Sequence, residues 1–293
     1  MQLLDGKKTS TDIKNEIAAE VKKMMADGQK VPHLAAVIVG SDGASLTYVG
    51  SKVRSCQQVG FESTLVALPE TISEADLLEK IKELNENYDL DGYIVQLPLP
   101  KHIDEQKILM AIDPDKDVDG FHPANFGKMA LEMATFLPAT PYGIMELLER
   151  YKVETAGKHT VVIGRSHIVG RPMSILMSRK GYPGDSTVTI THSRTKNIEE
   201  FTKNADIIIT ALGVPNYLKA DMVKDGVVVI DVGITRVEDA ASPKGYVITG
   251  DVDFDEVSKK ASFITPVPGG VGPMTIAMLL KNTLLARKIR SRK

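Results

Sequence analysis

A tyrosine and a lysine four residues apart form the pair whose chemistry is easiest to state. Tyr48 and Lys52 fall within the segment Ala44–Val59, which we expect to be helical, so their side chains share one face about one turn apart. A lysine withdrawn from water has a lowered pKa and can accept or donate a proton near neutral pH. The alternative is a half-buried tyrosine beside a solvated lysine.

An amide and a carboxylate follow predicted elements of the first half. Gln96 ends the predicted strand Gly92–Leu97, and ligands of open α/β sheets lie at the carboxyl ends of strands. A glutamine there can bond an amine without adding charge, although a plain surface amide is the alternative. The segment Asp113–Gly120 is similar to a calcium loop, but Phe126 stands where a bidentate glutamate is needed, so calcium is rejected. Its acids therefore cap the loop or, in the case of Asp119, face a ligand.

A glycine-bounded turn in the second half suits a phosphate. The β-branched run Val161–Ile163 predicts a buried parallel strand that Gly164 ends, and Gly170 opens the amphipathic segment Pro172–Arg179. A helix that begins at such a turn offers backbone N–H groups and partial positive charge to an anion. Because the spacing is not that of G-x-G-x-x-G, a purely structural turn stays open as an alternative.

Two further loops carry ligand-binding signals. His192-Ser-Arg-Thr195 follows the predicted strand Thr187–Thr191, at the place where NAD-specific folds carry an acid, so Ser193 and Arg194 favour NADP. The loop Pro266–Thr275 is rigid and poor in side chains, and its glycines allow a flat ligand to approach the backbone. A plain linker is the alternative for this loop.

The elements that position these residues alternate between helix and strand, which is typical of α/β proteins with parallel sheets. A proline-rich stretch from 97 to 141 lacks regular pattern and predicts connecting loops with a domain boundary; Thr140-Pro141 then predicts a helix start. The other predicted elements are helices over Ser10–Met25, from Ser73 to about Asn87, from Asn197 and from Met274 onward, and strands over Leu34–Val39, Glu62–Leu68, Asp206–Thr210, Val227–Val232 and Phe263–Thr265.

Composition excludes several classes of protein. The chain has 293 residues, 43% hydrophobic and 25% charged, and a net charge of -2, which gives no electrostatic reason to expect nucleic acid or an anionic membrane. Cys56 is the single cysteine, which excludes intrachain disulfides and a cysteine-built zinc site. No apolar run approaches the ~18 residues of a membrane span, and the first residues lack the pattern of a secretory or transit peptide. A cytoplasmic setting, with no metal, is expected.

Five motifs in this order and spacing resemble one enzyme family over nearly the whole chain. The family is that of the bifunctional methylenetetrahydrofolate dehydrogenase/methenyltetrahydrofolate cyclohydrolases. The matching pieces are Tyr48-Val-Gly-Ser-Lys52, Asp91-Gly-Tyr-Ile-Val-Gln-Leu-Pro-Leu-Pro100, Lys116-Asp-Val-Asp-Gly-Phe-His-Pro123, Gly164-Arg-Ser-His-Ile-Val-Gly-Arg-Pro172 and Pro266-Val-Pro-Gly-Gly-Val-Gly-Pro-Met-Thr275.

The resemblance implies an α/β fold of two domains with a cleft between them. Residues 1–139, completed by a C-terminal helix over 273–293, would form the catalytic folate domain, and 140–272 a Rossmann-like NADP-binding domain. It also implies a homodimer that works in one-carbon metabolism and purine biosynthesis. The enzyme would oxidise 5,10-methylenetetrahydrofolate with NADP⁺ and hydrolyse the methenyl product to 10-formyltetrahydrofolate. A dehydrogenase without the hydrolytic step and a non-catalytic folate- or nucleotide-binding protein are the alternatives.

The resemblance also assigns roles to residues. Lys52 would handle the proton, with Tyr48 as its neighbour, Gln96 as the group that orients it, and Asp119 as the carboxylate that binds the pterin ring. The folate site would further include Leu97 and the loop residues Pro266, Pro268, Gly269 and Gly270. The cofactor would be held by Gly164, Arg165, Ser166, Ser193, Arg194 and Ile234.

Overall fold

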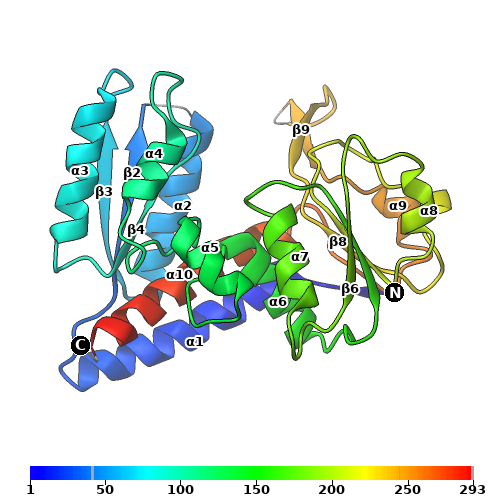
Figure 1. Ribbon diagram of the computed structural model, residues 1–293, viewed down its shortest axis with the longest axis horizontal. Coiled ribbons are helices and arrows are strands. Elements are labelled where there is room, and N and C mark those ends of the chain that lie inside the picture. The colour runs from blue at the N-terminus through cyan, green and yellow to red at the C-terminus, as the bar shows by residue number, and fades with distance from the viewer. Residues whose placement is uncertain (41–42, 244, 292–293) are drawn as a thin grey trace. The chain divides into compact units, whose positions relative to one another are not determined.

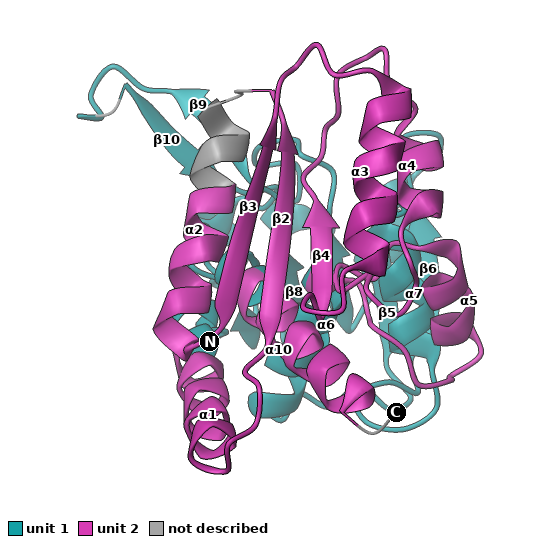
Figure 2. Cartoon of the chain, turned by 90° about the vertical axis from the view of Figure 1, so that its left-hand side faces the viewer, with its two compact units in different colours: residues 1–10, 140–275 teal, residues 11–139, 276–293 magenta. Residues whose placement is uncertain are grey.

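The chain folds into two compact units, coloured separately in Figure 2, in a computed structural model that describes residues 1–40, 43–243 and 245–291. The side chains of residues 43–48 lie outside this description. Unit 1 comprises residues 1–10 and 140–275, and unit 2 comprises 11–139 and 276–293. Residues 1–10 therefore pack with the second half of the chain, whereas the sequence placed them with the first.

Unit 2 is built on a parallel sheet of three strands in the order β3-β2-β4. The central strand is buried along almost its whole length, as expected for a strand covered on both faces, and its Val37 pairs with Val66 on one side and Val95 on the other. The elements are β2 (His33–Val39), α2 (Gly43–Val59), β3 (Glu62–Leu68), α3 (Glu74–Glu86), β4 (Gly92–Val95), α4 (Glu105–Ala111) and α5 (Pro123–Ala130). Figure 1 shows α3 and α4 close to this sheet, and their apolar residues share a core with β2 and β4.

Local capping explains where the helices of unit 2 begin. Ser73 Oγ accepts the backbone N–H of Asp76 at 3.1 Å, which confirms the predicted start of α3. The prediction of loops throughout 97–141 is wrong, because α4 and α5 lie within this stretch. Asp104 caps α4 by accepting two N–H groups, and Pro123 occupies the first turn of α5. These capping residues can be recognised in the sequence, but the helices are too short to give a periodic pattern.

Unit 1 carries a six-stranded parallel sheet in the order β1-β11-β8-β7-β5-β6. Strand β6 lies on one side of β5, whereas β7, β8 and β11 follow one another on the other side. The strand order therefore reverses between β5 and β7, which is the place where dinucleotide folds bind their ligand. The elements are β1 (Gln2–Leu3), α6 (Ala139–Arg150), β5 (His159–Ile163), α7 (Gly170–Ser178), β6 (Thr187–Thr191), α8 (Ile198–Thr202), β7 (Ile207–Thr210), a 3₁₀ turn (Ala220–Met222), β8 (Val228–Asp231), α9 (Phe254–Val257) and β11 (Phe263–Ile264).

Two features of unit 1 were not predicted. The strand β1 joins the sheet beside β11, and β9 (Thr235–Glu238) pairs with β10 (Tyr246–Thr249) as an antiparallel hairpin. The guanidinium of Arg236 lies 4.8 Å from the centre of the Tyr246 ring across this hairpin. None of these three strands has a buried residue, so they lack the apolar run that predicted the equally short strands β7 and β8.

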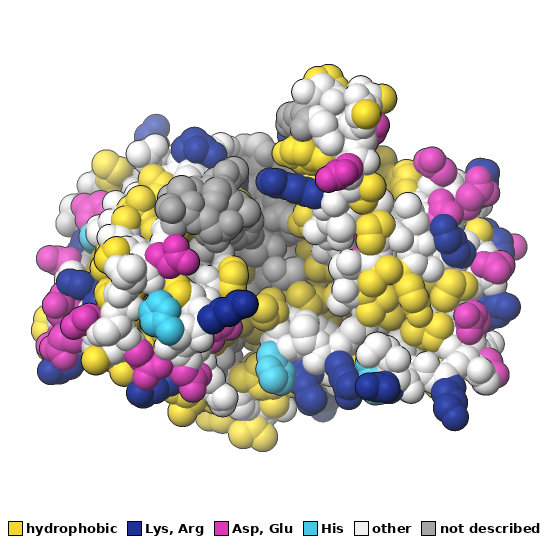
Figure 3. All heavy atoms as spheres, turned by 90° about the horizontal axis from the view of Figure 1, so that it is seen from above, with side chains coloured by type: hydrophobic (Ala, Val, Ile, Leu, Met, Phe, Trp, Pro, Cys, Tyr) yellow, Lys and Arg dark blue, Asp and Glu magenta, His cyan; other side chains and the backbone are white. Residues whose placement is uncertain are grey.

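Two long helices continue from one unit's residues into the other's. They are α1 (Gly6–Ala26) and α10 (Val271–Arg290), and each begins a few residues before the predicted start. Among the described residues, no helix is long and apolar enough to cross a membrane. Figure 3 shows acidic and basic side chains interspersed on the visible face, in keeping with the net charge of -2.

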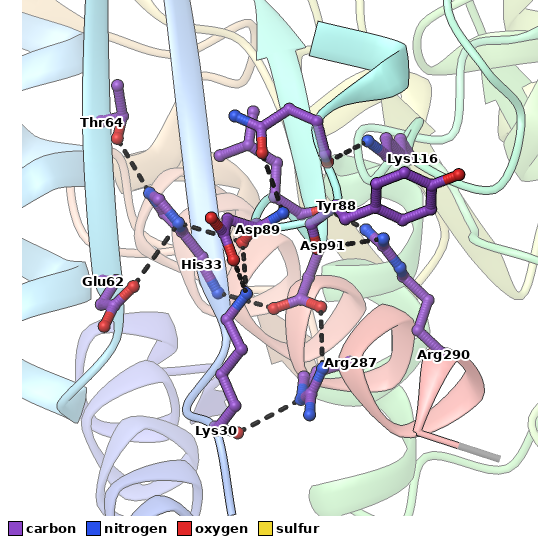
Figure 4. A network of polar contacts seen from close by, with 12 residues as sticks. Lys30, His33, Glu62, Thr64, Tyr88, Asp89, Asp91, Lys116, Arg287 and Arg290 are labelled. Carbon is purple, nitrogen blue, oxygen red and sulfur yellow. Dashed lines mark hydrogen bonds and ion pairs between the residues drawn. The ribbon is translucent and has the colours of Figure 1, made fainter. Parts of the chain in front are cut away.

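The end of α10 is tied to the amino edge of the unit 2 sheet by a polar network (Figure 4). Asp91, just before β4, is fully buried; its Oδ2 accepts the N–H of His33 at 2.9 Å. Its Oδ1 has no hydrogen-bond partner among the described residues and lies 3.6 Å from Arg287 Nη1. Arg287 Nε also donates to Lys30 O, and Arg290 donates to the carbonyls of Leu90 and Tyr88. Arg287 is therefore the cation that lies beside the Asp91 carboxylate, and Lys116 also interacts with it electrostatically.

We predict that Arg287→Ala lowers the free energy of unfolding by about 3 kcal/mol, because it removes the adjacent cation from a buried carboxylate. The matched control is Lys288→Ala, which removes the exposed pair with Glu20 and costs at most about 1 kcal/mol. Urea titration of the three proteins measures both values. Equal losses for the two variants would mean that the Arg287–Asp91 pair does not anchor the helix.

Candidate active site

The buried amine of Lys52 is the centre of the candidate site in unit 2. The lysine lies on α2 with only 5% of its surface exposed, and its Nζ donates to Gln96 Oε1 at 3.2 Å. Gln96 follows β4 directly, and its backbone N–H donates to Val37 O on the neighbouring strand. Its Nε2 donates to Leu97 O at 2.7 Å, which turns the amide oxygen toward the lysine. The predicted proximity of Lys52 and Gln96 is confirmed.

A strand-like segment beside β4 brings Asp119 to the same edge of the sheet. Tyr93 and Asp117 form a parallel bridge, and the N–H of Tyr93 donates to Lys116 O at 3.0 Å. A Cβ on Gly92 would overlap the Val118 side chain, so glycine permits this approach. Two residues beyond the bridge, the chain reaches Asp119, at the carboxyl end of the sheet where Gln96 also lies.

The Asp119 loop is held by two residues that the sequence analysis did not single out. Asp117 is buried and accepts the N–H of His122 at 2.7 Å and Asn125 Nδ2 at 2.9 Å. Asn282, on α10, donates to the carbonyls of Val118 and Leu137 at 2.8 and 2.9 Å. The one available signal for Asn282 was a polar residue at a position flanked by the apolar residues of the final helix. Bonds to backbone carbonyls far along the chain cannot be read from that signal.

Burial and mutual attraction set the charges of this group. Burial lowers the pKa of Lys52, and the negative charge of Asp119 raises it in part. Burial raises the pKa of Asp119, whose carboxyl group is enclosed although the residue as a whole is partly exposed, and Lys52 opposes that shift. The neutral form of the Lys52 amine is therefore reached at a lower pH than that of an exposed lysine.

Tyr48 and Cys56 lie on the same helix as Lys52. Tyr48 lies one turn before Lys52 on α2, but its side chain is outside the described part of the chain. Cys56 is buried on the same helix, and burial raises the pKa of its thiol to about 12. The thiolate is the reactive form of cysteine, so the buried thiol of Cys56 has low reactivity.

The predicted loop residues Pro266, Pro268, Gly269 and Gly270 belong to unit 1. There the N–H of Lys7 donates to Gly269 O at 2.8 Å, and a Cβ on Gly270 would come within 2.5 Å of Pro266 O. The glycines therefore let the loop fold back on itself and against the start of α1. Leu97, the other predicted folate residue, is partly buried in unit 2 and accepts the bond from Gln96.

The glycine turn joins β5 to α7 in unit 1. Gly164 has φ +126° and lies so close to β7 that a Cβ would be 2.5 Å from Ala211 O. A Cβ on Gly170 would overlap Gly164 O, so the first turn of α7 packs directly on the strand end. Ser166 Oγ accepts the N–H groups of Val169 and Gly170 at 3.1 and 3.4 Å, while Arg165 and Ser166 are exposed.

The other predicted cofactor residues lie at this same carboxyl edge of the sheet. The N–H of Gly164 donates to Thr191 O at 2.9 Å, and Ser193 and Arg194 follow two and three residues later with exposed side chains. Ile234, three residues beyond β8, is 62% exposed. The edge thus offers a helix N-terminus, hydroxyls, cations and an apolar side chain, which fit a phosphorylated dinucleotide.

Two family models match the chain. The model described as the tetrahydrofolate dehydrogenase/cyclohydrolase catalytic domain matches residues 4–119, and the one described as the NAD(P)-binding domain of the same enzymes matches residues 138–291. Together they span both predicted domains.

Individual relatives agree with the models. The bifunctional protein FolD of Flavobacterium johnsoniae is 84% identical over 293 residues, which is 100% of this chain and 99% of the relative. The crystal structure of the bifunctional FolD enzyme from Campylobacter jejuni superposes with a TM-score of 0.93 at 48% identity and covers 99% of each chain. The FolD structure from Trypanosoma brucei, complexed with NADP cofactor and inhibitor, has a TM-score of 0.92 at 38% identity and covers 99% and 98%. The chain belongs to the tetrahydrofolate dehydrogenase/cyclohydrolase family.

Proposed function

We propose that Lys52, Gln96 and Asp119 serve both reactions of the family at one folate site. The protein oxidises 5,10-methylenetetrahydrofolate to 5,10-methenyltetrahydrofolate with NADP⁺ and hydrolyses that product to 10-formyltetrahydrofolate. The observation that carries the proposal is the buried Lys52 amine, held by Gln96 and electrostatically coupled to Asp119. A protein selected only to bind folate would not need a desolvated lysine at this position.

The hydrolytic step needs a base more than any other group. The methenyl carbon is electrophilic because its positive charge is shared over two nitrogens, so water attacks it once a proton is removed. Lys52, whose pKa is lowered by burial, accepts that proton while the new carbon–oxygen bond forms. Ring opening then breaks one carbon–nitrogen bond and leaves the formyl group on the other nitrogen. The cationic substrate itself further favours the neutral lysine.

Gln96 and Asp119 position the reactants. The Gln96 amide is fixed by its bond to Leu97 O, so its oxygen holds the lysine amine in one direction without adding charge. By the family resemblance, Asp119 would accept hydrogen bonds from the pterin ring, and Tyr48 is the proposed neighbour of the amine. We assign Leu97 and the loop residues Pro266, Pro268, Gly269 and Gly270 to the folate site by resemblance.

The dehydrogenase step requires the cofactor residues at the carboxyl edge of the unit 1 sheet. NADP⁺, when bound, supplies the acceptor for hydride from the methylene carbon, and positioning contributes more to such a step than acid or base catalysis. Gly164 and Gly170 allow the close packing of the turn that would face the phosphates, and Arg165 and Ser166 lie exposed there. Ser193 and Arg194 would hold the 2′-phosphate, and Ile234 would contact the cofactor through its exposed side chain.

The remaining assignments concern the organisation of the protein. Residues 1–139 with 273–293 are proposed as the folate domain, and 140–272 as the NADP domain. A homodimer through the NADP domains is supported by the open edge of the sheet at β6, where Ile190 is 39% exposed. A cytoplasmic enzyme that provides formyl groups for purine biosynthesis and does not bind nucleic acid is in keeping with a net charge of -2 and one buried thiol.

A spectroscopic assay with Lys52→Met tests the proposal. With methylenetetrahydrofolate and NADP⁺, the wild type should form reduced cofactor without accumulating methenyl product. Lys52→Met should lower the hydrolysis rate by roughly 10²–10⁴-fold and let methenyltetrahydrofolate accumulate, because the base is lost. Lys14→Met, which removes another lysine whose pKa is lowered by burial, is the control and should retain both activities.

Each outcome separates the alternatives. A wild type that reduces NADP⁺ but accumulates methenyl product would be a dehydrogenase alone, and one that reduces neither NADP⁺ nor NAD⁺ would be a binding protein. Full hydrolysis by Lys52→Met would remove the lysine from the mechanism.

Asp119→Asn tests the carboxylate in two independent ways. Loss of a charge-assisted bond to the pterin should raise the KM for folate roughly 10- to 100-fold. Because Asp119 raises the pKa of Lys52, its removal should also shift the rising limb of the hydrolysis pH profile to lower pH. Asp115→Asn, an exposed acid in the same loop, should change neither value. An unchanged folate KM in Asp119→Asn would contradict the assigned role.

Arg194→Ala tests the cofactor preference. Loss of the guanidinium should raise the KM for NADP⁺ roughly 10- to 100-fold and leave the KM for NAD⁺ unchanged, because only NADP⁺ carries the 2′-phosphate. Lys196→Ala removes an exposed cation two residues later and should affect neither cofactor by as much. If discrimination between the cofactors survives in Arg194→Ala, the 2′-phosphate is bound elsewhere.

A further inference from the structure

Two buried carboxylates lie at the carboxyl edge of the unit 1 sheet, outside the residues assigned above. Asp231 ends β8 and is 3% exposed, and Asp251 follows β10 and is fully buried. They are adjacent, because the N–H of Asp251 donates to Asp231 Oδ1 at 3.0 Å. Among their described contacts, every donor is a backbone amide or a hydroxyl group, and none is a cationic side chain.

The Asp251 carboxylate accepts hydrogen bonds from the backbone amides of the loop that follows β7. Its Oδ2 accepts the N–H groups of Leu212 and Gly213 at 2.6 and 3.2 Å, and its Oδ1 accepts that of Val214 at 2.8 Å. The preceding residue of this loop, Ala211, is the one whose carbonyl lies against Gly164. One carboxylate therefore fixes the segment that borders the glycine turn, at the point where the strand order reverses.

The Asp231 carboxylate likewise accepts a hydrogen bond from the segment that follows β8. Its Oδ1 accepts Thr210 Oγ1 at 3.2 Å and the N–H of Gly233 at 2.9 Å, and its Oδ2 accepts the N–H of Val252 at 3.0 Å. Gly233 immediately precedes Ile234, a proposed cofactor residue. A Cβ on Gly233 would overlap the Asp251 carboxylate, so the two acids and this glycine are packed as one unit.

The burial of these two adjacent carboxylates has a high desolvation cost for a purely structural role. Two neighbouring carboxylates withdrawn from water repel each other, and burial raises the pKa of Asp231 to about 6. Apolar side chains would fill the space with a smaller desolvation cost, but they could not accept six N–H groups with defined directions. What the carboxylates provide is a single backbone geometry for two loops that flank the glycine turn.

We propose that Asp251 and Asp231 are positioning residues for NADP, because Asp251 holds the Leu212–Val214 segment and Asp231 holds the Gly233–Ile234 segment where the cofactor requires them. This inference rests on the proposed cofactor site at the glycine turn. The Asp251 carboxylate accepts its hydrogen bonds from Leu212, Gly213 and Val214 and not from the folate residues assigned above, so we expect its effect on cofactor binding and not on hydrolysis.

Asp251→Asn tests the inference, with Asp253→Asn as the matched control. An amide in place of the carboxylate presents N–H groups to at least one of the loop amides, which displaces the loop. NADP⁺ binding, measured by calorimetry, should weaken roughly tenfold or more, and the dehydrogenase kcat/KM should fall with it. Hydrolysis of methenyltetrahydrofolate without cofactor should stay within about twofold of the wild type. Asp253→Asn loses only the partly exposed pair with Lys219 and should match the wild type in all three.

Asp231→Asn is the second variant, and should show the same selective loss of NADP⁺ affinity. If a folded Asp251→Asn binds NADP⁺ as the wild type does, the inference is wrong. A parallel loss of NADP⁺ binding, hydrolysis and thermal stability in both variants would show a structural role instead, and would also overturn it. Failure of the proposed function is a separate result, because it would appear as no NADP⁺ binding by the wild type.

Discussion

The withdrawal of one lysine amine from water is the constraint on which the rest of unit 2 depends. An ammonium group is costly to bury, so burial lowers the pKa of Lys52, and the amide oxygen of Gln96 accepts a hydrogen bond from its amine. Asp119 prevents the shift from going too far, because its negative charge stabilises the protonated amine.

The parallel sheets explain why these groups meet. In unit 2, the register of β2 with β4 and the bridge between Tyr93 and Asp117 bring Gln96 and Asp119 to one edge. In unit 1, the same principle gathers the glycine turn and the Ser193–Arg194 segment. Both units then use buried acids or amides to fix the loops: Asp117 and Asn282 hold the Asp119 loop, and Asp231 and Asp251 hold the loops beside the glycine turn.

The sequence predicted the parts of the fold that rest on local signals. The cap at Ser73, the buried run around Val162 and the fold class could be read directly, and Lys52 and Gln96 were paired by their motifs. The short helices α4 and α5 and the β9–β10 hairpin were missed, because a few residues give no period. Asn282 and Asp251 were missed for a different reason: their partners are backbone groups about 40 to 160 positions away, and only the tertiary fold brings them together.

The most direct test is a measurement of the Lys52 pKa itself. Titration of lysine side chains by NMR, with Lys52→Met used to assign the signal, would report the amine in the folded protein. The account predicts a pKa below the ordinary value of 10.5, and a still lower one in Asp119→Asn, because burial opposes the charge and the carboxylate supports it. A Lys52 that titrates at or above 10.5 would contradict the central claim, since the amine would then be protonated throughout the working range of pH.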